Sequence, residues 1–249
     1  MRLLYNPTVT DTNRMTTMIV RKGVQKIYTE VARTYELVNH VLTLGLDILW
    51  RKKTARAAAQ MGGTVWLDVC SGTGEMARYL STLSDEGVNI FAVDFSFPML
   101  KKVRETGNAP NLNPVIAEAG VLPFADASLD LVTISFAARN LNPRTEILES
   151  YLEEFNRVLK PGGHFVNLET SQPSVKIIRK LFHFYVRRIV KPLGWILSGS
   201  KAGYSYLSFT IPRFYAPDEF ARILRQSGFS DVGFRRFLLG IAAMHVAKK

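Results

Sequence analysis

The sequence predicts an α/β fold built around a Rossmann-like, doubly wound sheet. Between residues 61 and 170, short apolar runs alternate with helical stretches, an order typical of parallel βαβ units with right-handed crossovers. A Gly-x-Gly loop follows the first apolar run and opens a helix, and ligands of doubly wound sheets bind beyond the carboxyl ends of such strands. The length of 249 residues suits one domain of this kind.

The spacing of apolar residues predicts the individual elements. Short apolar runs predict strands over residues 65–69, 89–93, 114–117, 130–136 and 164–168, with helices over residues 75–83, 98–105 and 144–159 between them. Upstream, intervals of three and four residues predict helix from Val24 to Trp50 and a second helical run to about Ala59. Downstream, we expect a basic helix over residues 175–190, a Gly/Ser-rich loop through Gly203, a helix over residues 217–227, and strands over residues 231–236 and 239–246.

Composition restricts the compartment and the partners. One cysteine, Cys70, excludes an intrachain disulfide and fits a reducing compartment. The chain contains no apolar stretch of transmembrane length and begins without a signal-peptide pattern, so we expect a cytoplasmic protein. The net charge is +6 over residues 1–60 (10 Lys/Arg, 4 Asp/Glu), −6 over residues 61–170 (8 and 14) and +11 over residues 171–249 (14 and 3). Only the flanks can therefore attract an anionic surface.

The glycine loop predicts a cofactor site, and by itself it allows two kinds of cofactor. Leu67–Glu75 reads LDVCSGTGE, in which glycines permit a tight turn and a close approach of the backbone to a ligand. Gly72, Gly74 and Ala77 also satisfy a dinucleotide fingerprint, and Asp94 follows Gly74 by 20 residues, where a dehydrogenase has its ribose-binding acid. The loop alone is therefore compatible with a nicotinamide cofactor.

Acids at neighbouring strand ends favour a cationic, phosphate-free cofactor. Asp68 would repel a pyrophosphate and attract an ammonium group, and Glu118 with the amide of Ala119 would meet the edge of an adenine. S-adenosyl-L-methionine carries an amino acid and a sulfonium cation and has no phosphate. Arg157–Glu169 adds a helix end, a Pro-Gly-Gly turn and a strand, an order typical of S-adenosylmethionine-dependent methyltransferases.

The chain resembles the ubiquinone/menaquinone biosynthesis C-methyltransferases from about Ile27 to His245. The motifs are YTEVARTYELVN at Tyr28–Asn39, Gly45–Trp50, LPF at Leu122–Phe124, TISFAARNL at Thr133–Leu141 and YSYL at Tyr204–Leu207, of which Ser-Phe-x-x-Arg-Asn is the most specific. The chain departs from the family pattern in having Glu75 in place of Asp and Ala202 in place of Asp, and in lacking a C-terminal Gly-Tyr-Lys.

This resemblance implies S-adenosylmethionine-dependent methylation of a ring carbon in a polyprenyl quinol. It implies a sheet of seven strands, mostly parallel, with an antiparallel last strand, in a single domain. That domain would comprise an N-terminal helical arm (1–60), a cofactor-binding core (61–170), a basic helical and loop insertion on the acceptor side (171–216), and a closing helix and strands (217–249). The residues expected to contact the cofactor are Asp68, Ser71, Gly72, Thr73, Gly74, Asp94, Phe95, Met99, Glu118, Ala119 and Ser135.

Four residues are expected on the acceptor side. A phenolic ring carbon becomes nucleophilic when the neighbouring hydroxyl loses its proton, so a cation that stabilises the phenolate would help. Arg139 is the candidate for this role, with a structural ion pair as the alternative, and Asn140 could orient the ring hydroxyl. Tyr35 and Tyr204 are expected to line the acceptor pocket. No group of histidines and acids has the spacing of a metal site, so none is predicted.

Residues 175–201 predict an interfacial helix. They hold seven Lys/Arg and no acid, with Ile178, Leu181, Phe182, Tyr185 and Ile189 on one arc and Lys176, Lys180, Arg187 and Lys191 opposite. A uniformly basic polar face favours peripheral attachment to an anionic membrane at its inner face, and a lid or core helix is the alternative.

Four classes of function remain at this stage. Quinol C-methylation leads, and methylation of another lipid, such as a phospholipid head group, is the alternative within the same chemistry. A nucleic-acid methyltransferase lacks support, because the chain has no catalytic Cys-Pro pair and no Asn-Pro-Pro-Tyr-type motif. A non-catalytic cofactor-binding scaffold would not need Arg139 and Asn140. The oligomeric state stays open, with a homodimer as one option.

Overall fold

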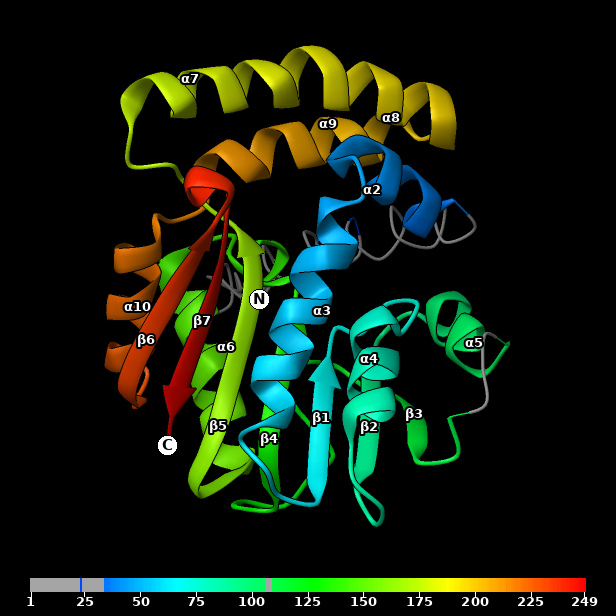
Figure 1. The fold of residues 1–249 in the computed structure, drawn as a ribbon, viewed down its shortest axis with the longest axis vertical. Helices are drawn as coiled ribbons and strands as arrows, with labels where there is room; N and C mark the ends of the chain where they lie inside the picture. Colours follow the sequence, from blue (N-terminus) through cyan, green and yellow to red (C-terminus); the bar gives the residue numbers. More distant parts are fainter. Residues whose placement is uncertain (1–22, 24–33, 106–108) are drawn as a thin grey trace, which may run out of the picture.

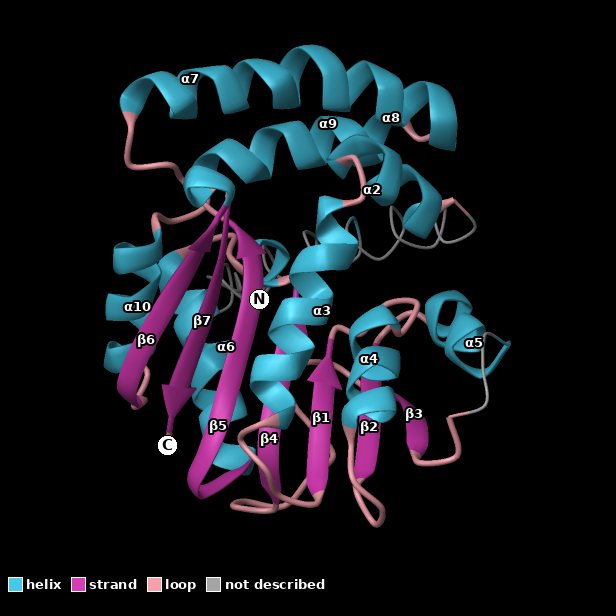
Figure 2. Cartoon of the chain, viewed as in Figure 1, coloured by secondary structure: helices cyan, strands magenta, loops and turns pink. Residues whose placement is uncertain are grey.

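The computed structural model describes Gly23, residues 34–105 and residues 109–249. Seven strands form one sheet in the order β3-β2-β1-β4-β5-β7-β6 (Figures 1 and 2). Adjacent strands pair in parallel from β3 to β5, whereas β7 is antiparallel to both of its neighbours. The predicted fold class is therefore confirmed. The strands are β1 (Val65–Val69), β2 (Asn89–Asp94), β3 (Leu112–Ile116), β4 (Leu129–Ser135), β5 (Leu159–Thr170), β6 (Ser230–Phe237) and β7 (Ala242–Lys248).

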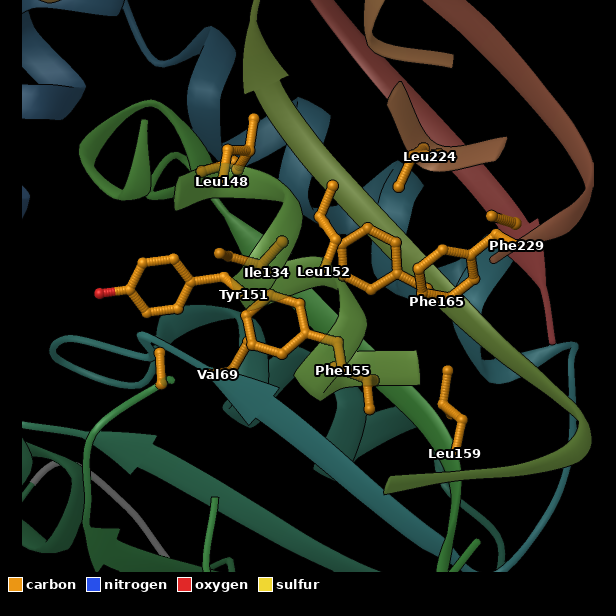
Figure 3. Packing of buried hydrophobic residues seen from close by; sticks show 14 of the residues in the cluster. Val69, Ile134, Leu148, Tyr151, Leu152, Phe155, Leu159, Phe165, Leu224 and Phe229 are labelled. Carbon is orange, nitrogen blue, oxygen red and sulfur yellow. The ribbon is translucent and has the colours of Figure 1, made fainter. Parts of the chain in front are cut away.

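Helices cover both faces of the sheet. One core cluster joins the sheet to α3 (Leu46–Ala59), α4 (Glu75–Leu83) and α5 (Phe97–Glu105). The other joins it to α6 (Thr145–Val158) and α10 (Pro217–Gln226). In the second cluster the rings of Phe155, Phe165 and Phe229 follow one another with centroids 5.8 and 5.4 Å apart (Figure 3). Because both faces are covered at the centre of the sheet, β1 and β4 are mostly apolar and buried, as parallel strands usually are.

A separate helical layer lies across the carboxyl ends of the parallel strands (Figure 1). It contains α2 (Tyr35–Thr43), α7 (Lys176–Tyr185), the π-helical segment η2 (Val186–Val190), α8 (Lys191–Ser198) and α9 (Lys201–Thr210). Short 3-10 turns complete the chain: η1 (Ala138–Leu141), η3 (Ile211–Arg213) and η4 (Leu238–Gly240). Within the described ranges, no helix has both the length and the apolar character needed to cross a membrane.

The helical layer corrects one prediction. The Gly/Ser-rich stretch that ends at Gly203 is helical instead of a loop, since α8 and α9 occupy most of it. Gly194 serves helix packing, because it lies against the ring of Tyr204, where a side chain would not fit, whereas Gly199 ends α8 with a φ of 74°. Composition suggested a loop, but long-range packing determined the conformation.

The N-terminal helices are also divided differently from the prediction. Leu44 and Gly45 have φ of 55° and 75°, so the continuous helix expected up to Trp50 breaks there into α2 and α3. The part of that prediction over residues 24–33 lies outside the described residues. Strand β5 begins at Leu159, earlier than expected, because the Pro-Gly-Gly segment bulges between two pairings with β4.

The contact between Gly194 and Tyr204 yields a stability prediction. A Cβ on Gly194 would lie 2.1 Å from the ring of Tyr204, so Gly194→Ala must push α8 and α9 apart. We expect a loss of ~1–3 kcal/mol, despite the better helix propensity of alanine, since overpacking a filled core typically costs that much. Thermal unfolding measures the loss. Gly233→Ala is the matched control, since nothing lies within 4 Å of its Cβ position; equal melting temperatures for the two variants would contradict the packing argument.

Candidate functional site

The loop between β1 and α4 is shaped by three residues with positive φ. Cys70, Gly72 and Gly74 have φ of 54°, 56° and 83°. A Cβ on Gly74 would lie 2.8 Å from the side chain of Val103, so this glycine allows α5 to approach the loop. A Cβ on Gly72 would meet no atom within 4 Å. The loop therefore turns bare backbone towards open space, as a ligand-binding loop does.

Asp94 fixes this loop from the end of β2. Its carboxylate oxygens accept hydrogen bonds from the backbone N–H of Gly72 at 2.9 Å and of Ser96 at 2.8 Å. Burial raises the pKa of Asp94, although the two amides act in the opposite direction. The side chain is thus held in place by backbone donors while it faces the adjoining cavity.

The loop borders a cavity, called here the loop cavity, with an empty volume of about 590 Å³. Seven of the predicted cofactor residues line it: Ser71, Gly72, Thr73, Asp94, Phe95, Met99 and Ser135. Asn140 also lines this cavity, although it was predicted for the acceptor side. The remaining lining residues were not predicted as site residues; they are Arg51, Cys70, Glu75, Met76, Phe136 and Ala137. Most of the predicted site is therefore assembled at one place.

Four predicted cofactor residues lie outside the lining of the loop cavity. Asp68 is fully buried in β1, where its carboxylate accepts a hydrogen bond from the hydroxyl of Thr133 at 2.8 Å. Gly74 packs against α5, Glu118 is exposed and Ala119 is buried, beyond the end of β3. Asp68 and Glu118 can influence a ligand through their charge, since both raise the pKa of the neighbouring Cys70 thiol, which burial raises most.

A second, larger cavity lies between the sheet and the helical layer. This apolar cavity has an empty volume of about 1090 Å³. The helical layer supplies Phe182, Tyr185, Val186, Val190 and Leu207, and the sheet side supplies Trp50 and Phe136. Its few polar groups are Asn39, Thr43, Asp47, Arg51, Arg139, Thr170 and Tyr185. An apolar pocket with a few convergent polar groups is the usual form of a small-molecule site.

The two cavities meet at Arg51 and Phe136, which line both. The guanidinium carbon of Arg51 lies 4.9 Å from the centroid of the Phe136 ring. Phe136 has a φ of 54°, which is uncommon for a residue with a bulky side chain and is typical of strained functional positions. The two cavities are therefore adjacent at these two side chains.

Arg139 lines the apolar cavity from η1. It is buried, and its NH1 group donates to Glu169 Oε1 at 2.6 Å and to the carbonyl of Phe136 at 2.7 Å. The structural ion pair considered from the sequence is thus present, and Arg139 is also among the residues that line the cavity. Tyr204, by contrast, is buried among Val38, Leu42 and Val190 and does not line the cavity. The side chain of Tyr35 lies outside the described residues.

The histidines are engaged in hydrogen bonds or lie away from the cavities. His245 is buried, donates a hydrogen bond from Nε2 to the backbone carbonyl of Pro217 at 2.9 Å, and has its pKa lowered by burial to about 4. His183 is hydrogen-bonded to Gln172 at 2.7 Å. His40 lies with Asp47 and Glu75 in a group close enough to hold a metal ion, but Arg51 already forms ion pairs with both carboxylates there. The absence of a metal site stays a prediction.

Comparison with known proteins assigns the chain to a family. Residues 15–249 match the model of the ubiE/COQ5 methyltransferase family. The chain belongs to this family. It is 37% identical over 225 residues to the demethylmenaquinone methyltransferase of Beutenbergia cavernae, covering 90% of this chain and 89% of that protein. It is 34% identical over 230 residues to the protein of that name in Staphylococcus aureus, covering 92% of this chain and 94% of that one.

Solved structures support the fold of this ubiE/COQ5 family member. A SAM-dependent methyltransferase from Thermotoga maritima matches with a TM-score of 0.61 at 15% identity, over 90% of this chain and 99% of that one. Human N-acetylserotonin methyltransferase, solved in complex with SAM, matches with a TM-score of 0.57 at 16% identity, over 87% of this chain and 57% of that one. The predicted family and the methyltransferase class are confirmed by the family match and the relatives.

Buried Asp68 makes the stability of this methyltransferase depend on pH. Burial raises the pKa of Asp68 to about 7, although the Thr133 hydroxyl acts in the opposite direction. A carboxyl group whose folded-state pKa lies above its unfolded value stabilises the fold at low pH, and this contribution is lost as pH rises towards the folded pKa. Asp68→Asn, which mimics the protonated group, should therefore gain stability relative to wild type as pH rises from about 4 to about 7.

Urea unfolding across this pH range measures the Asp68 effect. Asp130→Asn is the control, because Lys160 and two backbone amides lower the pKa of Asp130 even though partial burial acts the other way. That variant should lose stability relative to wild type above the unfolded pKa and approach wild type as pH falls. A stability difference for Asp68→Asn that does not change with pH would show that this carboxyl group does not titrate in the folded protein.

Proposed function

We propose that this methyltransferase binds S-adenosylmethionine in the loop cavity and transfers its methyl group to a ring carbon of demethylmenaquinol in the apolar cavity. The observation that carries the proposal is the meeting of a polar and a larger apolar cavity at Arg51 and Phe136. Methyl transfer is an in-line displacement, so it requires two bound molecules in contact more than it requires a reactive side chain.

The loop cavity fits a cationic, phosphate-free donor. Its lining contains the carboxylates of Asp94 and Glu75, and the buried carboxyl group of Asp68 lies behind the loop. The Ser71 hydroxyl is buried without a hydrogen-bond partner among the described residues, so it can bond a ligand. Bare backbone at Gly72 leaves room beside it. When bound, S-adenosylmethionine supplies a methyl group activated by a sulfonium.

The apolar cavity fits a ring with an isoprenoid tail. Its walls are mainly aliphatic and aromatic, and its volume exceeds that of the loop cavity. The relatives in Beutenbergia cavernae and Staphylococcus aureus carry the name demethylmenaquinone methyltransferase. This name favours a naphthoquinol over a benzoquinol or a phospholipid head group as the acceptor.

The chemistry then needs charge stabilisation at the acceptor ring. A quinol carbon becomes nucleophilic as a ring hydroxyl loses its proton, and a fixed cation stabilises the resulting oxyanion. The carbon–methyl bond then forms as the sulfonium–methyl bond breaks, S-adenosylhomocysteine leaves, and the ring carbon loses its proton to solvent, for a net release of one proton. Arg139 can provide that cation, because Glu169 and the Phe136 carbonyl hold its guanidinium at the cavity wall. Asn140 lies nearer the donor, among the residues that line the loop cavity, and can orient the bound donor.

The test is methyl transfer by the purified protein. Incubation with S-adenosylmethionine and chemically reduced, short-tailed demethylmenaquinone should yield a product heavier by one methyl group. Arg139→Ala should lower turnover by ~100- to 1,000-fold with little change in donor affinity, because one preorganised stabiliser of charge is lost. Mass spectrometry measures the product, and calorimetry measures donor affinity.

Two loop variants serve as controls for this experiment. Gly72→Val should abolish donor binding, because its side chain would enter the cavity from a backbone with positive φ. Cys70→Ala should bind the donor normally and stay active. Stabilisation of the protein by NAD(H) and not by S-adenosylmethionine would contradict the donor assignment. Methylation of a benzoquinol or a phospholipid but not of the naphthoquinol would contradict the acceptor assignment.

Residues 175–201 are proposed to attach the enzyme to anionic membranes, where a polyprenyl substrate resides. The structure changes the predicted orientation of this segment, because Phe182 is buried and Ile178 and Tyr185 are partly buried instead of facing outward. Leu181 and Ile189 of the predicted arc are exposed, together with Ile177, Phe184, Trp195 and Ile196 from outside it. Exposed basic residues accompany them, namely Lys176, Lys180, Arg187, Arg188 and Lys191. A surface with both features suits an anionic lipid interface.

Vesicle co-sedimentation tests this attachment. Replacing Lys180, Arg187, Arg188 and Lys191 with Gln should release the protein from anionic vesicles, because each basic residue near such a surface contributes roughly 1 kcal/mol. Activity on a short-tailed quinol should survive. The control replaces four exposed basic residues elsewhere, Lys52, Lys53, Arg56 and Arg222, and should bind vesicles as wild type does. If the wild-type protein does not bind anionic vesicles even at low salt, the attachment proposal is wrong, and residues 175–201 serve only as a wall of the apolar cavity.

A further inference from the structure

Four ionisable side chains form a closed ring beside the boundary of the two cavities. Arg51 NH1 lies 2.7 Å from Asp47 Oδ2, and Arg51 NH2 lies 3.4 Å from Glu75 Oε2. His40 bridges the same two carboxylates on the other side, with Nδ1 2.8 Å from Asp47 Oδ2 and Nε2 3.4 Å from Glu75 Oε1. Three helices, α2, α3 and α4, each contribute to the ring. The charges are therefore fixed relative to one another.

The ring connects the two cavities. Asp47 lines the apolar cavity, Glu75 lines the loop cavity, and Arg51 lines both. Arg51 and Asp47 are buried, with 4% and 2% of their side chains exposed. Burying an ion pair of this kind generally contributes little net stability, so stability alone does not explain a guanidinium at this position.

The net charge of this ring of ionisable side chains is compatible with a ligand in either cavity. One guanidinium faces two carboxylates, so the ring has a charge of −1 when His40 is neutral. A cationic donor in the loop cavity therefore does not meet a net positive group. Arg51 also lines the apolar cavity, and a guanidinium has five N–H donors in a planar fork, so one arginine can serve several acceptors.

We propose that Arg51 is a second acceptor-binding arginine, which donates a hydrogen bond to the ring oxygen next to the carbon that receives the methyl group. This inference rests on the proposed function. The reacting carbon must lie at the boundary of the cavities, so the adjacent oxygen lies there as well. Among the described residues, Arg51 is the charged donor that lines both cavities.

This role has a kinetic signature that a purely structural arginine lacks. A guanidinium that stabilises the oxyanion lowers the pKa of the bound hydroxyl, so the wild-type enzyme ionises its acceptor at lower pH than the free quinol ionises. Without Arg51 the oxyanion has one stabilising cation fewer, so the acceptor ionises only at higher pH. The loss of kcat in an Arg51 variant should therefore be largest near neutral pH and should shrink in alkaline solution.

The experiment compares three variants of the full chain with short-tailed demethylmenaquinol. Arg51→Gln should lower kcat at neutral pH by ~100-fold, the scale for loss of one preorganised donor, and Arg51→Lys should recover part of that loss by restoring the positive charge. Arg157→Gln is the matched control, because Arg157 also bridges two carboxylates, Glu154 and Asp126, but lines neither cavity. It should keep wild-type kcat at every pH.

Donor affinity and the pH profile together determine the outcome. Turnover of the quinol by the wild type tests the proposed function separately: a wild type without turnover contradicts the proposed function before any variant is compared. If the wild type is active, two results overturn the inference. In the first, Arg51→Gln binds the donor and has the same kcat as Arg157→Gln. In the second, Arg51→Gln loses the same factor of kcat at every pH. If Arg51→Gln does not fold, Arg51→Lys decides: a deficit that narrows with pH supports the role, and wild-type kcat throughout overturns it.

Discussion

Contact between a polar cavity and an apolar cavity is the constraint on which the rest of this structure depends. The donor of such a reaction carries charge and the acceptor is hydrophobic, so each needs its own environment and yet the two must touch. Arg51 over the ring of Phe136 marks the place where the cavities meet. The positive charge of Arg51 is balanced by the carboxylates of Asp47 and Glu75. The apolar cavity beside it is lined mainly by hydrocarbon side chains.

The sheet forms most of the polar environment, and the helical layer forms much of the apolar one. Parallel strands deliver Cys70, Asp94 and Ser135 to one edge, since their carboxyl ends coincide there. The helical layer then covers that edge with apolar side chains from α2, α7 and α9. The strained backbone at Cys70 and Phe136, at the ends of two adjacent paired strands, turns the chain away and leaves the space between them open.

How far the sequence predicts this site depends on whether the signal is local. The glycine loop, Asp94 and the Arg139 motif lie in short, recognisable strings, and the structure places them on the cavities. Arg51 was missed because an arginine on a helix resembles a solvated residue until α4 packs beside it. Tyr204 shows the converse, since its motif suggested a pocket residue and packing against Gly194 buries it. Helices α8 and α9 were missed for the same reason, because Gly and Ser are common in loops.

The insertion between β5 and α10 makes the enzyme modular. Every residue that lines the loop cavity falls between Arg51 and Asn140, whereas residues 171–216 contribute only to the apolar cavity. The part of the acceptor wall that the insertion supplies is thus encoded apart from the loop cavity, although Arg51 and Phe136 line both cavities. Evolution can lengthen, shorten or repack the insertion to admit a different ring or tail while the donor machinery stays unaltered. An engineer could follow the same route by grafting this segment between relatives.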